Sequence, residues 1–362
     1  MSVMTLVWFA VGLGLLVIGA ELLVRGASKL AAAAGISPLG VGLTVVAFGT
    51  SAPELAVSLG SAFKGQADIA IGNVVGSNIF NVLFILGISA LIVPLVVNVQ
   101  LIRVDVPLMI GASVLMWVLS LDGSLNRVDG LILFAGIVAY MIMAVRAGRK
   151  ESKAEEQSAG APGQTKDAVG GKAMAVDVGL IVIGLALLVL GANRFVGSAV
   201  ELAQAMGLSE VVIGLTIVAA GTSTPEVAAS IMASIKGQRD IAVGNVVGSN
   251  LFNILGILGI TAIASPASIE VKDAVLAVDI PIMTAVALAC LPIFFTGHVI
   301  ARWEGAVFLL YYIAYTAYLI LAATHHDALH GFSVVMLYFA LPITALTLGV
   351  IVWRAVRTPA PR

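Results

Sequence analysis

The sequence has 362 residues, of which 60% are hydrophobic and 11% are charged, and its formal net charge is -1. Because soluble domains carry about a quarter charged residues, this composition excludes an ordinary soluble protein. The mean hydropathy of +1.09 and repeated apolar runs of about 20 residues predict a helical protein embedded in a lipid bilayer. No basic, aromatic-interleaved surface predicts a nucleic-acid partner. The single cysteine, Cys290, excludes a disulfide within the chain and is interpreted as a small buried hydrophobe.

Five apolar segments in the first half predict five membrane-spanning helices. We expect them at Met4–Leu23, at Ser37–Phe63, at Ile69–Val93, from Pro107 to Leu121 and at Val128–Val145. The first segment lacks the basic start and the cleavage site of a signal peptide, so it is interpreted as a span. Asp105 and Pro107 suit a helix start, because a carboxylate meets free amides there and proline loses no needed donor.

A polar segment then divides the chain. Residues Arg146–Lys172 are rich in Gly, Ala, Ser and charged residues without apolar periodicity, so we expect a flexible, water-exposed linker. The second half repeats the pattern, with spans expected at Met174–Phe195, Glu210–Ile235, Ile241–Ala264, Val275–Phe295 and Trp303–Ala323. One further apolar segment, Phe332–Val352, has no counterpart in the first half.

The two halves are related by an internal repeat. The stretch Gly42–Leu91 returns 172 positions later as Gly214–Ile263, with 33 of 50 positions identical. Because each half has an odd number of spans, the second copy is inverted relative to the first, as in many secondary transporters. We therefore expect an all-α polytopic membrane protein whose ten-helix core consists of two inverted repeats. Its expected domains are a first repeat at 1–146, a linker at 147–173, a second repeat at 174–323 and an additional helix at 332–353.

Basic residues predict the orientation in the membrane. The linker and the carboxyl-terminal tail carry clustered Lys and Arg, and both are expected to face the cytoplasm. Five spans precede the linker, so the amino terminus is expected outside, in a multi-pass protein of the inner (plasma) membrane. Lys236 and Arg239 then also lie inside, whereas Lys64 lies outside against the rule.

Each repeat carries one carboxylate inside an apolar run, Glu54 in the first and Glu226 in the second. A charge near the bilayer centre costs about 3 kcal/mol on insertion scales unless it meets water, a partner or a cation. Such an acid could pair with a buried base or extend toward the interface, but neither half has a Lys or Arg at comparable depth. A duplicated acid without a basic partner therefore favours a mobile positive ion.

The residues before each acid favour the same interpretation. Pro53 and Pro225 have no amide hydrogen, so the helix should kink or break just before each glutamate. The carbonyls thereby freed, around Ala47–Thr50 and Ala219–Thr222, are candidate oxygen ligands. The neighbouring hydroxyls are those of Thr50, Ser51, Thr222 and Ser223. Prolines and small residues also occur in membrane helices for packing alone, but finding Gly-Thr-Ser-x-Pro-Glu twice at mid-span argues against packing as the sole reason.

The helix after each acid carries polar residues four positions apart, which line one stripe of a helix. The side chains expected to reach the ions are Ser77, Asn81, Ser249 and Asn253. Those expected to make interhelical hydrogen bonds are Asn73, Asn78, Asn245 and Asn250.

The candidate site thus contains carboxylates, hydroxyls, amides and carbonyls, without thiolate or imidazole. This hard-oxygen set suits Ca2+ or Na+ and is poor for Zn2+ or copper. Two acids neutralise one divalent or two monovalent ions, so the two cargoes can compete. A further Na+ bound by neutral oxygens would make exchange electrogenic.

The motifs Gly-Thr-Ser-x-Pro-Glu and Gly-Asn-x-x-Gly-Ser-Asn, each present twice, resemble those of the sodium/calcium exchanger branch of the cation/Ca2+ antiporter superfamily, prokaryotic type. The resemblance covers both alpha repeats, 42–91 and 214–263, and the ten-span layout. It implies Na+/Ca2+ antiport by alternating access, with Ca2+ held by Glu54, Glu226 and the carbonyls of Thr50 and Thr222. It implies central positions for Asn81 and Asn253, and Na+ sites built by Ala47, Thr50, Ser51, Ser77, Ala219, Thr222, Ser223 and Ser249. Potassium-dependent branches have an aspartate at the position of Asn253, so this chain departs from them.

Two other transport functions remain open from the residues alone. A proton-coupled Ca2+ exchanger could also use two glutamates, because carboxylates carry protons. A Ca2+ channel could line a pore with two acids, although an inverted repeat around one mid-membrane site fits an antiporter better. We expect neither an enzyme nor a resident cofactor, since no nucleophile–base pair or zinc motif lies at depth. The sequence leaves the oligomeric state open.

Overall fold

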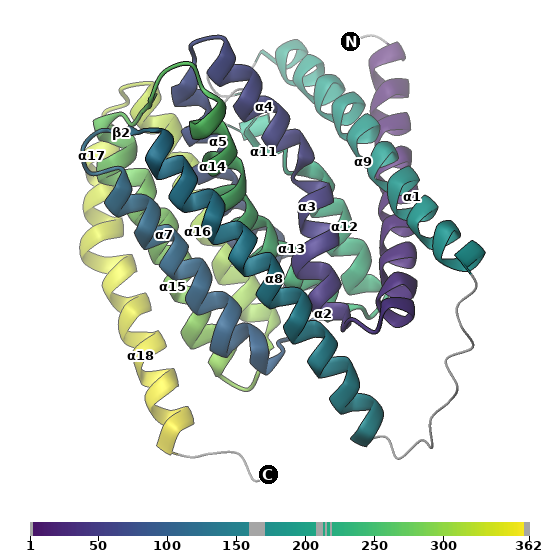
Figure 1. The fold of residues 1–362 in the computed structure, drawn as a ribbon. Helices are drawn as coiled ribbons and strands as arrows, with labels where there is room; N and C mark the ends of the chain where they lie inside the picture. Colours follow the sequence, from purple (N-terminus) through teal and green to yellow (C-terminus); the bar gives the residue numbers. More distant parts are fainter. Residues whose placement is uncertain (1–2, 159–170, 208–212, 214–215, 218, 358–362) are drawn as a thin grey trace.

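A computed structural model describes residues 3–158, 171–207, 213, 216–217 and 219–357 (Figure 1). Helices dominate, because a backbone inside lipid must satisfy its own hydrogen bonds. Within these described ranges, nine helices are long and apolar enough to cross a membrane, and the bent pair Pro38–Thr50 and Ala52–Phe63 makes up to ten spans. The all-α, polytopic prediction is confirmed. The predicted span Glu210–Ile235 lies partly outside the described residues.

The elements follow the order expected from the sequence, and the label η marks short π-helical turns. The first half forms α1 (Val3–Ala34), α2 (Pro38–Val41), η1 (Gly42–Val46), α3 (Ala47–Thr50), α4 (Ala52–Phe63), α5 (Ala67–Phe80), η2 (Asn81–Leu86), α6 (Gly87–Ile92), β1 (Leu95–Val96), η3 (Leu101–Asp105), α7 (Val106–Leu119), β2 (Ser124–Leu125) and α8 (Arg127–Ser158). The second half forms α9 (Gly171–Ala205), α11 (Ala219–Gly221), α12 (Thr224–Ile235), α13 (Arg239–Leu251), η5 (Phe252–Ile257), α14 (Leu258–Ala264), β3 (Ile269–Glu270), η6 (Val275–Asp279), α15 (Ile280–Phe295), β4 (Val299–Ile300) and α16 (Arg302–Ala323). The additional segment forms α17 (Ala328–Val335), η7 (Met336–Ala340) and α18 (Leu341–Arg357).

Three helices run further than the sequence predicts, and one of them is α9, which continues past Phe195 to Ala205. Helix α1 continues past Leu23 to Ala34, because the alanines at its end are strong helix formers. Helix α8 continues to Ser158, into the segment expected to be a flexible linker. Its Ala, Glu, Lys, Gln and Arg residues favour a helix even without an apolar stripe. The remainder of the linker, 159–170, lies outside the described residues.

The fourth span begins earlier than predicted, at Leu101. Asp105 therefore lies inside the helix rather than capping its start, and its side chain is buried. Its carboxylate accepts hydrogen bonds from Tyr140 and Gln100, each at 3.2 Å. The second half repeats this contact, with Tyr315 donating to Asp279 at 2.9 Å. A polar pair thus joins the fourth and fifth spans of both repeats.

Two short antiparallel strand pairs connect the halves and reveal how they are related. Strand β1 pairs with β4, and β2 pairs with β3. Because β1 and β3 follow the third span of their repeats, and β2 and β4 follow the fourth, each pair joins one repeat to the other. If the two repeats are interchanged, β1 takes the place of β3 and β4 takes the place of β2. The β1–β4 pair thereby becomes the β3–β2 pair, as a two-fold axis between the repeats requires. With an odd number of spans per repeat, that relation inverts the second repeat.

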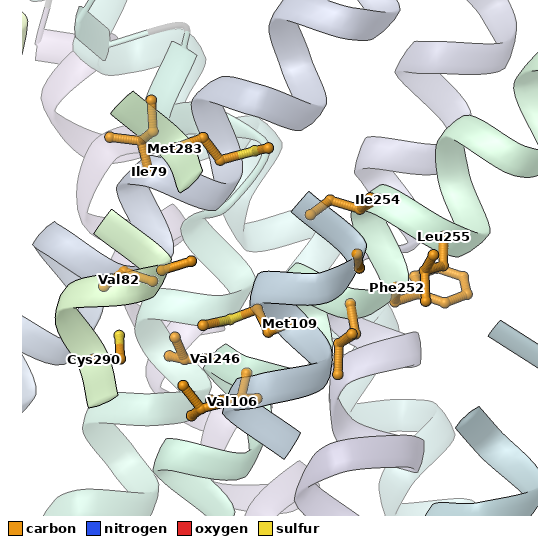
Figure 2. Packing of buried hydrophobic residues seen from close by; sticks show 14 of the residues in the cluster. Ile79, Val82, Val106, Met109, Val246, Phe252, Ile254, Leu255, Met283 and Cys290 are labelled. Carbon is orange, nitrogen blue, oxygen red and sulfur yellow. The ribbon is translucent and has the colours of Figure 1, made fainter. Parts of the chain in front are cut away.

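The repeats share one core rather than packing as separate domains. Figure 2 shows Met109 of the first repeat close to Val246 of the second, with Phe252, Met283 and Cys290 in the same cluster. Cys290 is fully buried, as the sequence predicted. The most enclosed spans are Arg239–Ala264 and Ile69–Ile92, with 89% and 72% of their apolar windows buried. These two central helices carry the asparagine and serine stripes.

Helices α1 and α9 form a closely packed pair at one side of the molecule (Figure 1). Glycines recur at every seventh position, at Gly12, Gly19 and Gly26 of α1 and at Gly184 and Gly191 of α9. A Cβ on Gly19 would lie 2.8 Å from the carbonyl oxygen of Gly184, and one on Gly184 would lie 2.7 Å from a backbone nitrogen of α1. Only small residues allow two backbones to approach this closely.

The additional helix lies on the outside of the core. It packs against α15 and α16, and the Tyr311 hydroxyl donates to the carbonyl of Ala340 at 3.3 Å. An apolar cavity of about 780 Å³ is lined by residues of these helices and of the additional segment. None of the candidate ion-binding residues lies on this helix, so it stands apart from the site.

Candidate functional site

The site begins where one span of each repeat breaks. Helix α3 ends at Thr50, Ser51 leaves helical geometry with φ -81° and ψ 8°, and α4 starts at Ala52. Ser223 has nearly the same angles, φ -86° and ψ 9°, before α12. Each proline falls in the first turn of the new helix, where its missing amide hydrogen costs nothing. The glutamate that follows lies in the positive first turn, which favours a negative charge.

The two acids meet across the repeat boundary. The Ser51 hydroxyl donates to Oε1 of Glu226 at 2.9 Å, and the Ser223 hydroxyl donates to Oε1 of Glu54 at 2.8 Å. Both glutamates are only 1% exposed. Each acid is therefore held by the residue that precedes the other acid by three positions. The structure brings together the two carboxylates that the sequence placed in separate halves.

Several buried oxygens of the candidate ligands have no hydrogen-bond partner within the described part of the chain. They are Oε2 of Glu54 and of Glu226, Oδ1 of Asn81 and of Asn253, and the Ser249 hydroxyl. A buried acceptor left unpaired costs about 1–3 kcal/mol, so these five oxygens are unfavourable for the protein alone. All five can coordinate a cation. Four of them form two pairs related by the repeat.

The threonine hydroxyls make hydrogen bonds that the sequence did not predict. The Thr50 hydroxyl contacts the carbonyl of Val46 at 3.1 Å and Oδ1 of Asn245 at 3.2 Å. The Thr222 hydroxyl donates to Oδ1 of Asn73 at 3.3 Å. Each threonine thus binds an asparagine of the opposite repeat with its side chain, and its backbone carbonyl remains the candidate ligand.

Asn73 and Asn245 make the interhelical hydrogen bonds that the sequence predicts, and their partners lie on the helices that carry the acids. Asn73 donates to the backbone carbonyl of Glu54 at 3.2 Å and to the Ser58 hydroxyl at 3.1 Å. Asn245 donates to the Ser230 hydroxyl at 2.9 Å. Sequence reasoning missed Ser58 and Ser230. Their position four residues after each glutamate, on the same helix face, was the available signal.

Three further predicted residues differ in their surroundings. The Ala47 carbonyl, expected to be freed by the helix break, accepts the amide hydrogen of Ser51 at 3.1 Å and lies 3.4 Å from the Thr50 hydroxyl. Its counterpart Ala219 begins α11, and its side chain lies outside the described residues. The Ser77 hydroxyl lies 3.1 Å from the Ser223 hydroxyl, which itself donates to Glu54, so Ser77 lies near that carboxylate.

The donor set is one of oxygen alone. Across the described residues, no group of three or more His, Cys, Asp or Glu side chains is arranged to hold a metal ion. The two carboxylates are instead completed by hydroxyl, amide and carbonyl oxygens, which suit hard cations. These candidate ligands come from both inverted repeats, an arrangement typical of secondary transporters.

The family follows from comparison with known proteins. Residues 4–146 and 176–321 match the family model described as sodium/calcium exchanger protein. This chain belongs to the sodium/calcium exchanger family. It is 38% identical over 316 residues to the putative antiporter CaxA of Alkalimonas amylolytica, covering 85% of this chain and 96% of that protein. It is 32% identical over 336 residues to the sodium/calcium exchanger MaX1 of Methanosarcina acetivorans, covering 84% and 95%.

A solved structure agrees with this family assignment. The sodium-calcium exchanger NCX_Mj, soaked with 10 mM Na+ and zero Ca2+, superposes with a TM-score of 0.74 at 29% identity, covering 88% of this chain and 99% of that one. The fold of this chain, with its inverted repeats, is therefore that of a sodium/calcium exchanger. The family match ends at residue 321, so α17 and α18 lie beyond it.

In this exchanger fold, the second-repeat half of the site is closely packed. Asn245 is completely buried and Gly244 beside it is buried. A Cβ on Gly244 would lie 3.1 Å from the carbonyl of Leu39, so a small residue is needed at this contact.

Proposed function

We propose that this chain is a secondary antiporter that exchanges Na+ for Ca2+ across the membrane by alternating access. The observation that carries the proposal is the pair of buried carboxylates from opposite repeats, each with one oxygen bound by a serine and one without a partner among the described residues. Oxygen ligands of this kind suit Ca2+ and Na+. Membership of the sodium/calcium exchanger family supports the same two ions.

The proposed Ca2+ ligands are the carboxylates of Glu54 and Glu226 and the backbone carbonyls of Thr50 and Thr222. Asn81 and Asn253 supply amide oxygens at the centre, in keeping with their unpartnered Oδ1 atoms. The flanking Na+ sites are proposed to use Ala47, Thr50, Ser51, Ser77, Ala219, Thr222, Ser223 and Ser249. The Ala47 carbonyl accepts the Ser51 amide hydrogen at 3.1 Å and lies 3.4 Å from the Thr50 hydroxyl. Na+ at this carbonyl would therefore replace the Thr50 contact, which leaves that hydroxyl its shorter contact with Val46 at 3.1 Å.

The charges of the two carboxylates suggest how many ions are exchanged in each cycle. Two carboxylates balance one Ca2+ or two Na+, so the ions compete for the same negative charge. A third Na+ at the neutral oxygens carries one positive charge across the membrane per cycle, and exchange is then electrogenic. The ions are cargo, and the proposed transport cycle needs neither a cofactor nor a covalent enzymatic step.

The proposed location is the inner (plasma) membrane, with the amino terminus outside and the linker and carboxyl terminus in the cytoplasm. The basic residues at the end of α8, Arg146, Arg149 and Lys150, support this orientation, as do Arg354 and Arg357 at the end of α18. Accessibility of single cysteines introduced at Lys64 and Lys236 to an impermeant reagent, in a Cys290→Ala background, tests it. Labelling of Lys236→Cys rather than Lys64→Cys from outside would reverse the orientation.

The decisive experiment uses purified protein in liposomes loaded with Na+. An outward Na+ gradient should drive 45Ca2+ uptake, and an inside-positive potential should speed it if three Na+ leave per Ca2+, because one net positive charge then moves outward. Uptake that ignores Na+ and follows an imposed pH gradient would replace Na+ by protons as the counter-ion. Uptake that needs no counter-ion would identify a channel. Adding K+ to the exchange buffer should change nothing, since Asn253 is uncharged.

A further inference from the structure

Four asparagines form a two-fold symmetric hydrogen-bonded cluster between the central helices. Asn78 donates to the backbone carbonyl of Asn250 at 3.3 Å, and Asn250 donates to the backbone carbonyl of Asn78 at the same distance. Their side-chain oxygens accept from the other two members. Asn253 donates to Oδ1 of Asn78 at 3.1 Å, and Asn81 donates to Oδ1 of Asn250 at 3.0 Å.

The side-chain NH2 groups of Asn81 and Asn253 both donate into this cluster. An asparagine amide has one face that accepts hydrogen bonds or cations and one that donates and repels cations. In each residue the NH2 group donates to an asparagine of the other repeat. The side-chain oxygen is buried without a partner among the described residues. A 180° flip of either amide would turn its NH2 group toward the site.

We propose that Asn78 and Asn250 are positioning residues that lock the amides of Asn253 and Asn81 with their oxygens toward the cations. The inference rests on the proposed function, because it assumes that these oxygens bind the transported ions. Asn78 and Asn250 contact no ion themselves. Their own amides are fixed by the reciprocal backbone bonds, so each repeat orients the ligand of the other. The sequence predicted only interhelical hydrogen bonds for this pair.

The fourth spans complete the arrangement. The Asn78 amide also lies 3.6 Å from the sulfur of Met283, and the Asn250 amide lies 3.5 Å from the sulfur of Met109. Figure 2 shows both methionines within the shared core. Sulfur is a weak acceptor, so these contacts fill space around the asparagine cluster and do little to fix the orientation of its amides. This difference provides a matched control.

The test is an Asn78→Leu variant, which removes the acceptor for the Asn253 amide at similar volume. Loss of an orienting partner typically weakens metal binding by about 10–100-fold, so the concentration of Ca2+ giving half-maximal exchange should rise at least ~10-fold, while the maximal rate changes little. Met283→Leu, a volume-conserving change beside the same amide, should leave both values within about 2-fold. An equal loss in both variants would reduce the role of Asn78 to packing.

A double-mutant cycle separates orientation from packing. In an Asn253→Asp background both terminal oxygens can bind a cation, so the side chain has no wrong orientation to suppress. Asn78→Leu should then change Ca2+ affinity by less than about 3-fold, in contrast to its effect beside Asn253. A full, additive loss in the aspartate background would overturn the proposal. The symmetry-related pair, Asn250→Leu with Asn81→Asp, repeats the cycle, so that poor folding of one variant does not end the test.

Binding is measured by Ca2+-induced thermal stabilisation of the purified protein, beside 45Ca2+ exchange. If the unsubstituted protein shows neither response to Ca2+, the proposed function fails and not only this inference. If Ca2+ stabilises the unsubstituted protein and Asn78→Leu equally, with unchanged half-maximal concentrations, the positioning role alone is refuted. Melting temperature without ions reports any loss of packing separately.

Discussion

Replacing one glutamate by glutamine should weaken Ca2+ binding far more than Na+ binding. In Glu54→Gln the shape and the Ser223 contact are kept, since the amide oxygen can still accept the hydroxyl at 2.8 Å. One unit charge about 4 Å from a cation, at an effective dielectric constant of about 20, contributes about 4 kcal/mol for Na+ and about 8 kcal/mol for Ca2+. Dehydration and the remaining amide oxygen offset part of this loss. Half of each value still corresponds to a ~30-fold loss for Na+ and a ~1,000-fold loss for Ca2+.

The assay compares equilibrium 45Ca2+ and 22Na+ binding to purified protein, with Na+-driven 45Ca2+ uptake in liposomes as the transport readout. Uptake by Glu54→Gln should fall to background. The matched control is Asp105→Asn, another buried acid, whose carboxylate is bound by Tyr140 and Gln100. That variant should keep exchange, because its acid belongs to a helix contact. Near-normal uptake by Glu54→Gln, or equal losses for the two ions, would refute the reasoning.

Three other outcomes follow from the geometry. Ser51→Ala removes a hydrogen bond to a buried carboxylate, worth about 1.5–3 kcal/mol, so half-maximal Ca2+ should rise at least ~10-fold in 45Ca2+ uptake; an unchanged value contradicts the cross-repeat contact. Gly184→Ala places a Cβ 2.7 Å from the backbone of α1 and should lower the melting temperature by several degrees through overpacking of about 1–3 kcal/mol. Gly14→Ala, with nothing within 4 Å of the added atom, is its control, and equal melting temperatures would oppose the close packing. Truncation after residue 327 removes α17 and α18, yet Na+-driven uptake should persist, because none of the proposed ion ligands lies there; a complete loss in folded protein would give the additional helix a role in transport.

The meeting of Glu54 and Glu226 could be predicted because duplication and parity leave few alternatives. A repeated motif with one acid, in two halves of five spans, requires inversion, and inversion brings equivalent segments to one axis. The lengths of the apolar runs predicted the spans, because a helix of about 20 residues crosses the bilayer and satisfies its own backbone hydrogen bonds there. Neither inference needed side-chain detail, and both describe the structure.

The division of labour among the polar residues could not be predicted. Thr50 and Ser51 are adjacent hydroxyls with the same ligand chemistry, yet one binds Asn245 and the other binds Glu226. The break in the helix at Ser51 decides which way each hydroxyl points, and its exact register depends on packing against the opposite repeat. The orientation of the Asn81 amide is likewise invisible in a sequence, because it depends on a hydrogen bond to Asn250.

The composition after Arg146 led to a wrong prediction of a flexible linker, because a helix can form there without packing against the rest of the protein. The polar residues after Arg146 lack an apolar stripe, which argued against a helix, yet α8 continues to Ser158. A helix already nucleated in the membrane can extend into water at little cost if its residues favour helix, because nucleation is the expensive step. The pattern of hydrophobic residues predicts which helices are buried, and it is less informative about where an exposed helix ends.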